Sequence, residues 1–340
     1  MATAQHFSNS LVEQRKLLAG TAAVELDSGV IRIGGEDRLE WLHSMLTADF
    51  KNLKPGVSRE ALLLDVQGHV QRVFHAVDDG AVTTLIVAGD AVEPLLVWFD
   101  RMTFRSKVTI ANASADYVVL ATVASIDGLQ ADWTDPWPDT VLGGVRYAKS
   151  QGASWGYREF LIHRDDYLSF TSKFEPAGLA ALDALRIAAW RPSLAEVDER
   201  TMPHEVDWMA TAVHLTKGCY RGQEAVAKTH NLGHPPRRLV FLHLDGSGHV
   251  LPEAGAEIWV VNADGTRSER ARGVVTSVAQ HYEQGPIALG LVQRSVSEEA
   301  ALVVVDKHSE VPAAQEVIVP ADAGKAAGLV RPNLLMGGRK

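Results

Sequence analysis

The N-terminal part of the chain combines short apolar runs with two amphipathic segments, a pattern typical of an α+β layer. The expected elements are a strand at 30–33, a helix at 35–43, strands at 61–66, 69–77 and 81–87, a helix opening at 90–93 and continuing through 95–99, and a strand at 107–110. Gln67-Gly68 between two strands is typical of a hairpin turn, and Asp90 with Glu93 has the spacing of a capping box. This order predicts a ferredoxin-like unit with helices on one face of a sheet.

A second unit of the same kind follows. Residues 116–123 read as a strand, and the proline-rich stretch 131–138 reads as a loop. Apolar and polar residues alternate again at 156–162, which predicts another strand. The run 176–187 predicts a helix with Pro176 at or near its first turn.

From Arg237 onward the pattern changes to short apolar runs separated by Gly, Pro, Asn and Asp, with no helical periodicity between them. These runs lie at 239–242, 257–261, 273–278, 287–292, 302–305 and 317–319. Such spacing predicts a small closed β-barrel that forms a separate domain, with Pro235-Pro236 as its hinge. The segment from Ala321 to Lys340 is rich in Gly, Ala, Lys and Arg, and we expect it to be poorly ordered.

The fold class is therefore predicted to be α+β, with two ferredoxin-like domains and a C-terminal all-β barrel. The expected boundaries are 20–112 for the first α+β domain, 113–234 for the second, 235–322 for the barrel and 323–340 for the tail. A length of 340 residues with 46% hydrophobic residues agrees with two or three domains, because one core rarely organises so long a chain.

Composition also restricts the chemistry and the compartment. A single cysteine, Cys219, excludes an intrachain disulfide and excludes a cluster or zinc site ligated by several cysteines of one chain. Residues 1–20 are polar, and no window offers about eighteen uninterrupted apolar residues, as a membrane span needs. We expect a cytoplasmic protein in a reducing compartment, without a membrane partner.

A formal net charge of −9 argues against a protein whose main partner is a nucleic acid, because that role requires a basic face. Local basic groups remain: Arg101, Arg105 and Lys107, and the pair Arg237 and Arg238. They could hold a small anion such as a polyglutamate tail. The alternative is that they are solvated charges at the ends of elements.

The segment Lys217-Gly218-Cys219-Tyr220-Arg221-Gly222-Gln223-Glu224 contains the single cysteine and precedes a short run of helix formers, Gln223 to Leu232, closed by Asn231 and Gly233. Cys219 is thus expected near a helix start, where backbone N–H groups and the flanking Lys217 and Arg221 would stabilise a thiolate. The alternative is a buried cysteine that acts as a small hydrophobic residue. A metal site of Cys219 with His214 and His230 is disfavoured, since their spacing is not that of metal ligands.

The same eight residues match the K-G-C-[FY]-x-G-Q-E signature of the YgfZ group, folate-binding proteins that support iron–sulfur enzymes and are related to GcvT, the aminomethyltransferase of glycine cleavage. The similarity extends from about Ile31 to about Arg294. This resemblance implies a three-lobed ring with tetrahydrofolate in its central opening. It also implies that Cys219 is the functional thiol. The cofactor contacts it implies are Lys217, Gly218, Tyr220, Arg221, Gly222, Gln223 and Glu224.

The chain departs from these relatives at two positions. GcvT relatives carry an aspartate a few residues after a glycine in the first hairpin, where this chain has Gln71 and Arg72. A neutral amide or a cation cannot neutralise a developing ammonium there, which leaves enzymatic activity uncertain. Relatives also commonly use a glutamate to hold the pterin, where this chain has Ala188. The acids nearest in sequence that could replace it are Glu196 and Glu205, and we expect Glu205 to contact the ligand.

Two functions follow from this resemblance. The first is a tetrahydrofolate-binding accessory protein that supports assembly or repair of iron–sulfur clusters in client enzymes, with tRNA-modifying enzymes among the candidate clients. The signature around Cys219 favours it. The second is a folate-dependent one-carbon transferase that acts on an unknown amine donor, and the missing aspartate counts against it. A plain ligand-binding module with a structural cysteine is the third alternative.

Overall fold

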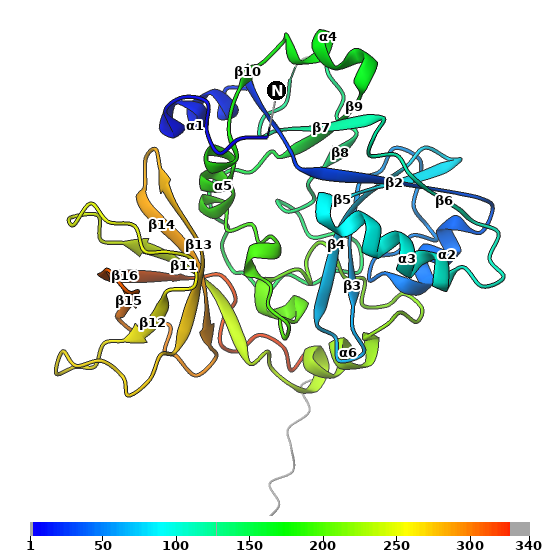
Figure 1. The fold of residues 1–340 in the computed structure, drawn as a ribbon. Helices are drawn as coiled ribbons and strands as arrows, with labels where there is room; N and C mark the ends of the chain where they lie inside the picture. Colours follow the sequence, from blue (N-terminus) through cyan, green and yellow to red (C-terminus); the bar gives the residue numbers. More distant parts are fainter. Residues whose placement is uncertain (1–2, 127, 327–340) are drawn as a thin grey trace, which may run out of the picture.

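The computed structural model describes residues 3–126 and 128–326, and three β-sheets organise this part of the chain (Figure 1). The first sheet has the strand order β3-β4-β5-β2-β6, with antiparallel neighbours throughout. Its strands are β2 (Ser28–Gly34), β3 (Arg59–Leu64), β4 (Val70–Asp78), β5 (Val82–Ala88) and β6 (Thr109–Asn112). All five were predicted from the pattern, to within a few residues at their ends.

Helices α2 (Arg38–Met45) and α3 (Val92–Met102) pack on this sheet. Trp41 of α2 and Phe99 of α3 lie with their ring centres 5.3 Å apart in the same buried cluster as Phe74 of β4. The predicted capping box is wrong, because α3 is preceded by a 3-10 turn, η1 (Gly89–Ala91), and its N-terminus has no side-chain cap.

The hairpin between β3 and β4 is confirmed. The Asp65 carboxylate accepts hydrogen bonds from the backbone N–H groups of Gln67 and His69, at 2.9 and 2.8 Å. Gly68 has a φ of 84°, a conformation that favours glycine and closes the turn. The tip of this hairpin later meets the segment that contains Cys219.

The second sheet has the order β10-β1-β7-β9-β8. Its strands are β1 (Ala22–Glu25), β7 (Tyr117–Thr122), β8 (Trp133–Thr134), β9 (Arg158–His163) and β10 (Glu175–Pro176). The helices of this unit are α1 (Ser10–Leu18), α4 (Tyr167–Thr171), preceded by η2 (Arg164–Asp166), and α5 (Leu179–Ala188). The stretch expected to be only loop therefore contains one short strand, β8.

Two further predictions for this unit need correction. β1 pairs with β7 and β10, so the expected boundary at residue 20 assigns Ala22–Glu25 to the wrong sheet. Pro176 does not open a helix, because it lies in β10 opposite Ala23, and α5 begins only after Gly178. The residue pattern of a short strand such as β1 does not indicate which sheet the strand joins. A proline is tolerated at the edge of a sheet as well as at the start of a helix, so Pro176 fits either position.

The third sheet is a closed antiparallel barrel, β11-β14-β13-β12-β15-β16, which confirms the predicted all-β domain. Its strands are β11 (Arg237–Leu244), β12 (Glu257–Val260), β13 (Gly273–His281), β14 (Gly285–Gln293), β15 (Leu302–Val305) and β16 (Glu310–Val317). The tail predicted as poorly ordered packs as far as Ala326, whose N–H donates to the His230 carbonyl at 2.9 Å. Residues 327–340 lie outside the described residues.

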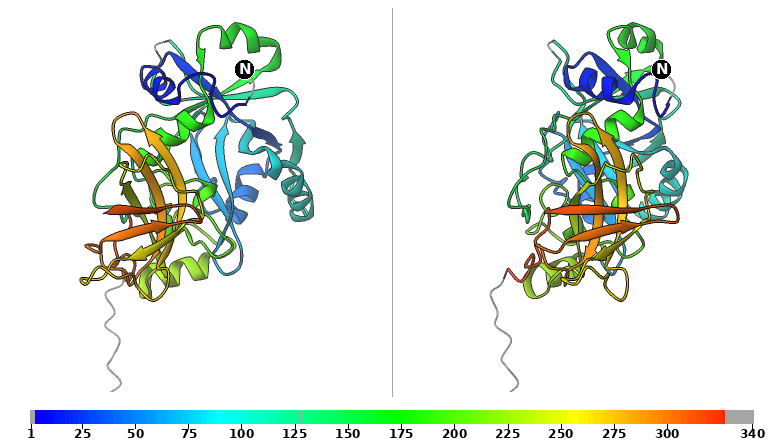
Figure 2. Two further views of the ribbon diagram at one scale, coloured as in Figure 1. Left: turned by 60° about the vertical axis from the view of Figure 1, so that its left-hand side comes forward. Right: turned by 90° about the vertical axis from the view of Figure 1, so that its left-hand side faces the viewer.

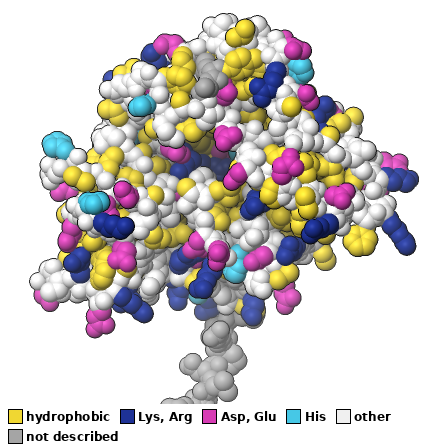
Figure 3. Space-filling model, in the orientation of Figure 1, with side chains coloured by type: hydrophobic (Ala, Val, Ile, Leu, Met, Phe, Trp, Pro, Cys, Tyr) yellow, Lys and Arg dark blue, Asp and Glu magenta, His cyan; other side chains and the backbone are white. Residues whose placement is uncertain are grey.

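The two α+β units and the barrel surround a central hollow, visible in the space-filling view, with acidic and basic side chains at its edge (Figures 2 and 3). One buried apolar cluster joins all three: Leu62 of β3, Ile187 of α5 and Leu289 of β14 belong to it. The segments that connect them include η3 (Leu194–Glu196), η4 (Pro203–Val206) and α6 (Gln223–Leu232). None of the helices described here has the length and hydrophobicity to cross a membrane.

Candidate functional site

A cavity of about 330 Å³ lies between the first sheet and the second α+β unit. Its walls come from β4, β5, β9, α5 and the segment 191–195 that follows α5. The polar and aromatic side chains that line it are Ser28, Glu60, His75, Asp135, Trp155, Tyr157, Glu159, Asp183, Arg186, Arg191, Ser193 and Trp208. A cavity that combines apolar walls with a few convergent polar groups is typical of a small-molecule site.

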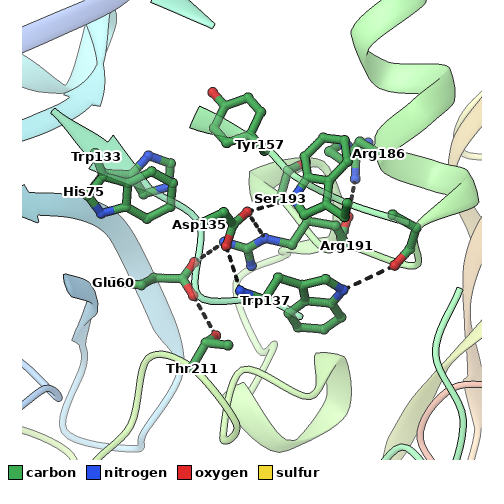
Figure 4. A network of polar contacts seen from close by, with 12 residues as sticks. Glu60, His75, Trp133, Asp135, Trp137, Tyr157, Arg186, Arg191, Ser193 and Thr211 are labelled. Atoms are coloured by element: carbon green, nitrogen blue, oxygen red, sulfur yellow. Dashed lines mark hydrogen bonds and ion pairs between the residues drawn. The ribbon is translucent and has the colours of Figure 1, made fainter. Parts of the chain in front are cut away.

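Arg191 is the centre of the charged network in this cavity (Figure 4). Its guanidinium donates to Glu60 at 2.6 Å and to Asp135 at 2.8 Å, and it is only 4% exposed. Asp135 also accepts from the Trp155 indole at 2.8 Å, and Glu60 accepts from the Thr211 hydroxyl at 2.5 Å. The second Asp135 oxygen accepts from the Trp137 backbone N–H at 2.9 Å. Both carboxylates therefore have all their oxygens engaged by protein groups, which offsets the cost of burying three charges.

A second group lies beside this network. His75 Nδ1 is 2.8 Å from Glu159 Oε1, and the Tyr157 hydroxyl donates to the same oxygen at 2.7 Å. The His75 ring stacks on Trp133 with a centroid distance of 3.8 Å and an angle of 6° between the planes. Burial disfavours the charged imidazole, but the Glu159 carboxylate, with Glu60 and Asp135, outweighs it and raises the pKa of His75.

Three buried atoms of the cavity residues lack a hydrogen-bond partner, and one of them is the Trp208 indole nitrogen. The other two are Glu159 Oε2 and one terminal nitrogen of Arg191, Nη1, while the remaining polar atoms of these two charged groups are engaged. Glu159 is 2% exposed. An unpaired buried carboxylate oxygen or guanidinium nitrogen is costly and rare in folded proteins. The charged residues that line the cavity thus carry one spare acceptor and one spare donor.

The Cys219 segment lies elsewhere, below the tip of the β3–β4 hairpin in Figure 1. The predicted helix is confirmed as α6, with Gly222 as its N-cap at a φ of 83°. A Cβ on Gly222 would lie 2.5 Å from the Asp65 carbonyl oxygen, so the close approach to the hairpin requires glycine. This contact fixes the motif against the first unit, although the chain order assigns the motif to the second.

Cys219 itself is exposed, so the alternative of a buried structural cysteine is wrong. It lines an open depression of about 770 Å³ together with His43, Asp49, His214 and Lys217. Asp49 lies 3.1 Å from His43 Nδ1, and burial is the main cause that lowers the pKa of His43. No group of three or more potential metal ligands occurs among the described residues.

Lys217 does not serve the thiol as expected. Its ammonium group donates to the carbonyl oxygens of His43, Leu46 and Ala48, which lie at and beyond the C-terminal end of α2. These are carbonyls that a helix end leaves unpaired, and a cation satisfies them well. Burial lowers the pKa of Lys217 to about 7 against the opposing effect of Asp49. Lys217 is therefore a structural residue of the motif.

The other motif residues divide into two groups. Tyr220 is buried with its ring centre 5.0 Å from the Lys217 ammonium, and Gln223 donates to the Lys217 carbonyl at 3.3 Å. Arg221 and Glu224 are exposed, as is Gly218. None of the eight motif residues is among those that line the central cavity. Their predicted contact with a cofactor stays a prediction.

Glu205 and Glu196 do not offer a free oxygen. The Glu205 carboxylate is fully buried and accepts from the Met202 N–H and from the backbone and guanidinium of Arg237. Glu196 accepts from Arg186 at 2.9 Å and from the hydroxyl group of Ser277. Of the acids considered for the role lost at Ala188, neither has a spare acceptor, whereas Glu159 does.

The basic residues singled out in the sequence also occupy different settings. Arg237 pairs with Glu205 and Asp198, and Arg238 is fully buried against the Val296 carbonyl and Gln315. An anion-binding role for this pair is therefore not supported. Arg101, Arg105 and Lys107 are exposed at the end of α3 and beyond it, as the alternative of solvated charges predicts. Gln71 and Arg72 line a separate groove near Asp198.

The molecule can now be compared with known proteins. No family model matches the chain. It is 24% identical to an aminomethyltransferase of Thermosipho melanesiensis over 288 residues, which cover 76% of this chain and 78% of that protein. It is 25% identical to the tRNA-modifying protein YgfZ of Colwellia psychrerythraea over 236 residues, 66% of this chain and 72% of that protein.

The resemblance to the YgfZ group of the GcvT superfamily is confirmed. Among solved structures, the glycine cleavage system aminomethyltransferase T of Bartonella henselae superposes with a TM-score of 0.71. The match covers 94% of each chain at 19% identity, which establishes the GcvT-like fold and not the activity. The predicted fold class is therefore confirmed as well.

The residues of the central cavity were missed in the sequence. Glu60, Asp135 and Arg191 are separated by as many as 131 positions and meet only in the folded chain. One signal was available: Tyr157 and Glu159 alternate along the strand expected at 156–162, so they share one face of a sheet. A buried glutamate on that face, with an aromatic hydroxyl beside it, indicates a polar site.

Proposed function

We propose that this chain binds tetrahydrofolate, or a close folate derivative, in the central cavity. The observation that carries the proposal is the pair of unpartnered atoms on charged residues that line the cavity, Glu159 Oε2 and Arg191 Nη1. A reduced pterin ring presents N–H donors beside a carbonyl acceptor, so it can satisfy both. The volume lies at the low end of about 300–1,000 Å³ that ligand pockets span, which suits the ring better than the whole folate.

Calorimetry with tetrahydrofolate tests this proposal. Glu159→Gln keeps the volume of the side chain but replaces one acceptor oxygen by a donor, so the affinity should fall by about tenfold or more, equivalent to about 1.4 kcal/mol. Glu224→Gln changes an exposed motif acid in the same way and serves as the matched control. An affinity lost in Glu224→Gln and kept in Glu159→Gln would favour the motif as the folate site and contradict the cavity.

We further propose that the protein supports assembly or repair of iron–sulfur clusters in client enzymes, without glycine-cleavage aminomethyltransferase activity. Two facts support this role: an exposed thiol within the YgfZ signature, and the absence of an acid at positions 71 and 72. The similarity to the tRNA-modifying protein of Colwellia psychrerythraea supports tRNA-modifying enzymes among the clients. The activity of iron–sulfur enzymes in cells that lack the protein tests the role.

The alternative is a folate-dependent one-carbon transferase that acts on an amine donor. One observation favours it, namely the imidazole and carboxylate of His75 and Glu159 at the cavity. Turnover assays with folate, candidate methylamines and a glycine-cleavage carrier protein separate the two functions. Turnover with the carrier protein would contradict the accessory role, and turnover with another amine would establish the alternative.

A further inference from the structure

His75 and Glu159 form an oriented pair, and the second oxygen of Glu159 and the second ring nitrogen of His75 have no hydrogen-bond partner among the described residues. Because an ionised carboxylate only accepts, His75 Nδ1 must carry the proton of the 2.8 Å contact with Glu159. The other ring nitrogen, Nε2, is then the atom at which the imidazole can gain or lose a proton. Among the described residues, Nε2 has no hydrogen-bond partner and is not sealed from solvent.

Three contacts hold this pair in one geometry. Trp133 stacks on the imidazole face, and its own indole N–H donates to the Arg59 carbonyl at 3.2 Å, which fixes the platform. Tyr157 donates to the same Glu159 oxygen as His75. His75 and Glu159 come from β4 and β9, strands of the two different sheets, so the pair lies where the two α+β units meet.

The position of the pair relates it to the missing aspartate. In β4 the side chains of Val73 and His75 alternate with the buried ones of Phe74 and Ala76, so they share one face of the sheet. A register shift opposite Leu63 and Leu64 interrupts this alternation at Gln71. Val73 and His75 line the central cavity, whereas Gln71 lines the neighbouring groove. Strand β4 therefore lacks a carboxylate at its start, but further along it presents His75, whose imidazole pairs with the Glu159 carboxylate.

We propose that His75 is an acid–base group of the central cavity, which exchanges the proton on Nε2 with a nitrogen of the bound ligand, and that Glu159 positions it. The inference rests on the proposed function, since a reduced folate supplies such a nitrogen. As the N–H bond on the ligand forms, the Nε2–H bond breaks, and the neutral imidazole keeps its Nδ1–H on Glu159. Water then returns the proton to Nε2.

The charged groups around His75 agree with this role. Glu159 contacts it, and Glu60 and Asp135 act on it from β3 and from the segment after β8. Arg191, the nearest cation of the network, is engaged by Glu60 and Asp135. The net effect raises the pKa of His75 and so favours the protonated imidazole, the form that can donate from Nε2.

The first test does not depend on folate. Diethyl pyrocarbonate modifies neutral imidazole nitrogens, and mass spectrometry locates the modified histidines. His75 should react only as the pH rises above the ordinary histidine range of about 6.5, and Glu159→Gln should move this onset to lower pH. His69, whose Nδ1 lies 2.9 Å from Asp65, is a matched internal comparison outside the cavity. No modification of His75 at any pH would show that Nε2 is closed and overturn the proposal.

The second test is the pH dependence of affinity for 5-formyltetrahydrofolate, measured by calorimetry in two buffers of different ionisation heat. Donation from Nε2 favours the protonated imidazole, so binding should take up a proton, and affinity should fall by at most about tenfold per pH unit above the pKa of His75. His75→Asn should abolish this uptake, and His69→Asn should preserve it. Unchanged proton uptake in His75→Asn overturns this proposal alone, whereas the absence of folate binding overturns the proposed function as well.

Discussion

The central cavity and the Cys219 depression use charge in opposite ways. In the cavity, buried ions neutralise one another across β3, the segment after β8 and the segment after α5, and few atoms are left without a partner. At the depression the single cysteine is exposed, and the buried ammonium group of Lys217 donates to carbonyl oxygens at the C-terminal end of α2. The cavity thus surrounds its polar groups with protein, as the proposed folate site requires, whereas the depression leaves the thiol open to solvent.

The difference also separates stability from function. A change in the cavity disturbs charges that cannot reach water, whereas a change at Cys219 disturbs neither core nor charge pairs. We therefore expect stability and ligand binding to respond together in the cavity, and function alone to respond at the depression. The following predictions, ordered from the largest effect to the smallest, test this separation.

Arg191→Met should have the largest effect. It leaves the Glu60 and Asp135 carboxylates buried without their cation, which should lower the free energy of unfolding by about 3–5 kcal/mol. Chemical denaturation measures this, with the exposed Arg221→Met as control. If Arg191→Met lost no more unfolding free energy than Arg221→Met, the network would not be the stabilising unit we describe.

Gly222→Ala should disturb the contact between motif and hairpin. The added Cβ would meet the Asp65 carbonyl at 2.5 Å, and the positive φ adds strain, so we expect a loss of about 2 kcal/mol or more. Gly255→Ala separates the two causes, because Gly255 has a φ of 92° but no atom within 4 Å of a Cβ. Equal losses in the two variants would mean that the close approach to the hairpin contributes nothing.

His204 should make the motif helix sensitive to acid. It is fully buried beneath α6, with Nε2 3.1 Å from the Val226 carbonyl, and burial lowers its pKa to about 3. The unfolded chain binds this proton below about pH 6.5 and the folded chain does not, so stability should fall with decreasing pH by up to about 1.4 kcal/mol per unit.

His204→Gln keeps an N–H donor but cannot titrate, so it isolates this contribution. Urea unfolding of both proteins between about pH 4 and 7 should give a shallower slope for the variant. Parallel slopes would assign the acid sensitivity to other groups.

Cys219→Ser should have the smallest effect on the fold. An exposed, nearly isosteric exchange should change stability by no more than about 0.5 kcal/mol. The activity of iron–sulfur enzymes in cells that carry only this variant should nevertheless fall. A large drop in Tm would mean that the thiol is structural, and full client activity with an intact fold would mean that it is dispensable.

The sequence predicted local structure better than it predicted the site. Five of the barrel strands and α6 follow from local alternation and turn residues, and the structure has them where the pattern indicates. The last strand, predicted at 317–319, lies instead at Glu310–Val317 as β16, because its alternating residues include few large apolar ones. The sheet membership of β1 and the meeting of Glu60, Asp135 and Arg191 depend on pairing between distant segments. Such contacts are set by the whole fold, and no local pattern states them.

The family signature located the exposed thiol but not the side chains around it. Residue 222 must be glycine because a Cβ there would collide with the Asp65 carbonyl oxygen. Residue 217 is a lysine whose ammonium group binds the carbonyl oxygens at the end of α2. Both sets of carbonyl groups belong to the first α+β unit, which is distant from the motif in the sequence. A motif read alone suggests chemistry for each residue, although in this chain two of them serve packing.

The membership of β1 has a consequence for how the protein is made. Residues 22–25 leave the ribosome early, yet their partners in β7 and β10 follow only at 117–122 and 175–176. The whole first unit, from β2 to β6, is synthesised in between and pairs only with itself in its sheet. Because domains generally fold as units during synthesis, the first unit can close while β1 waits unpaired, and a pause in translation before residue 176 would prolong the exposure of that apolar strand to aggregation.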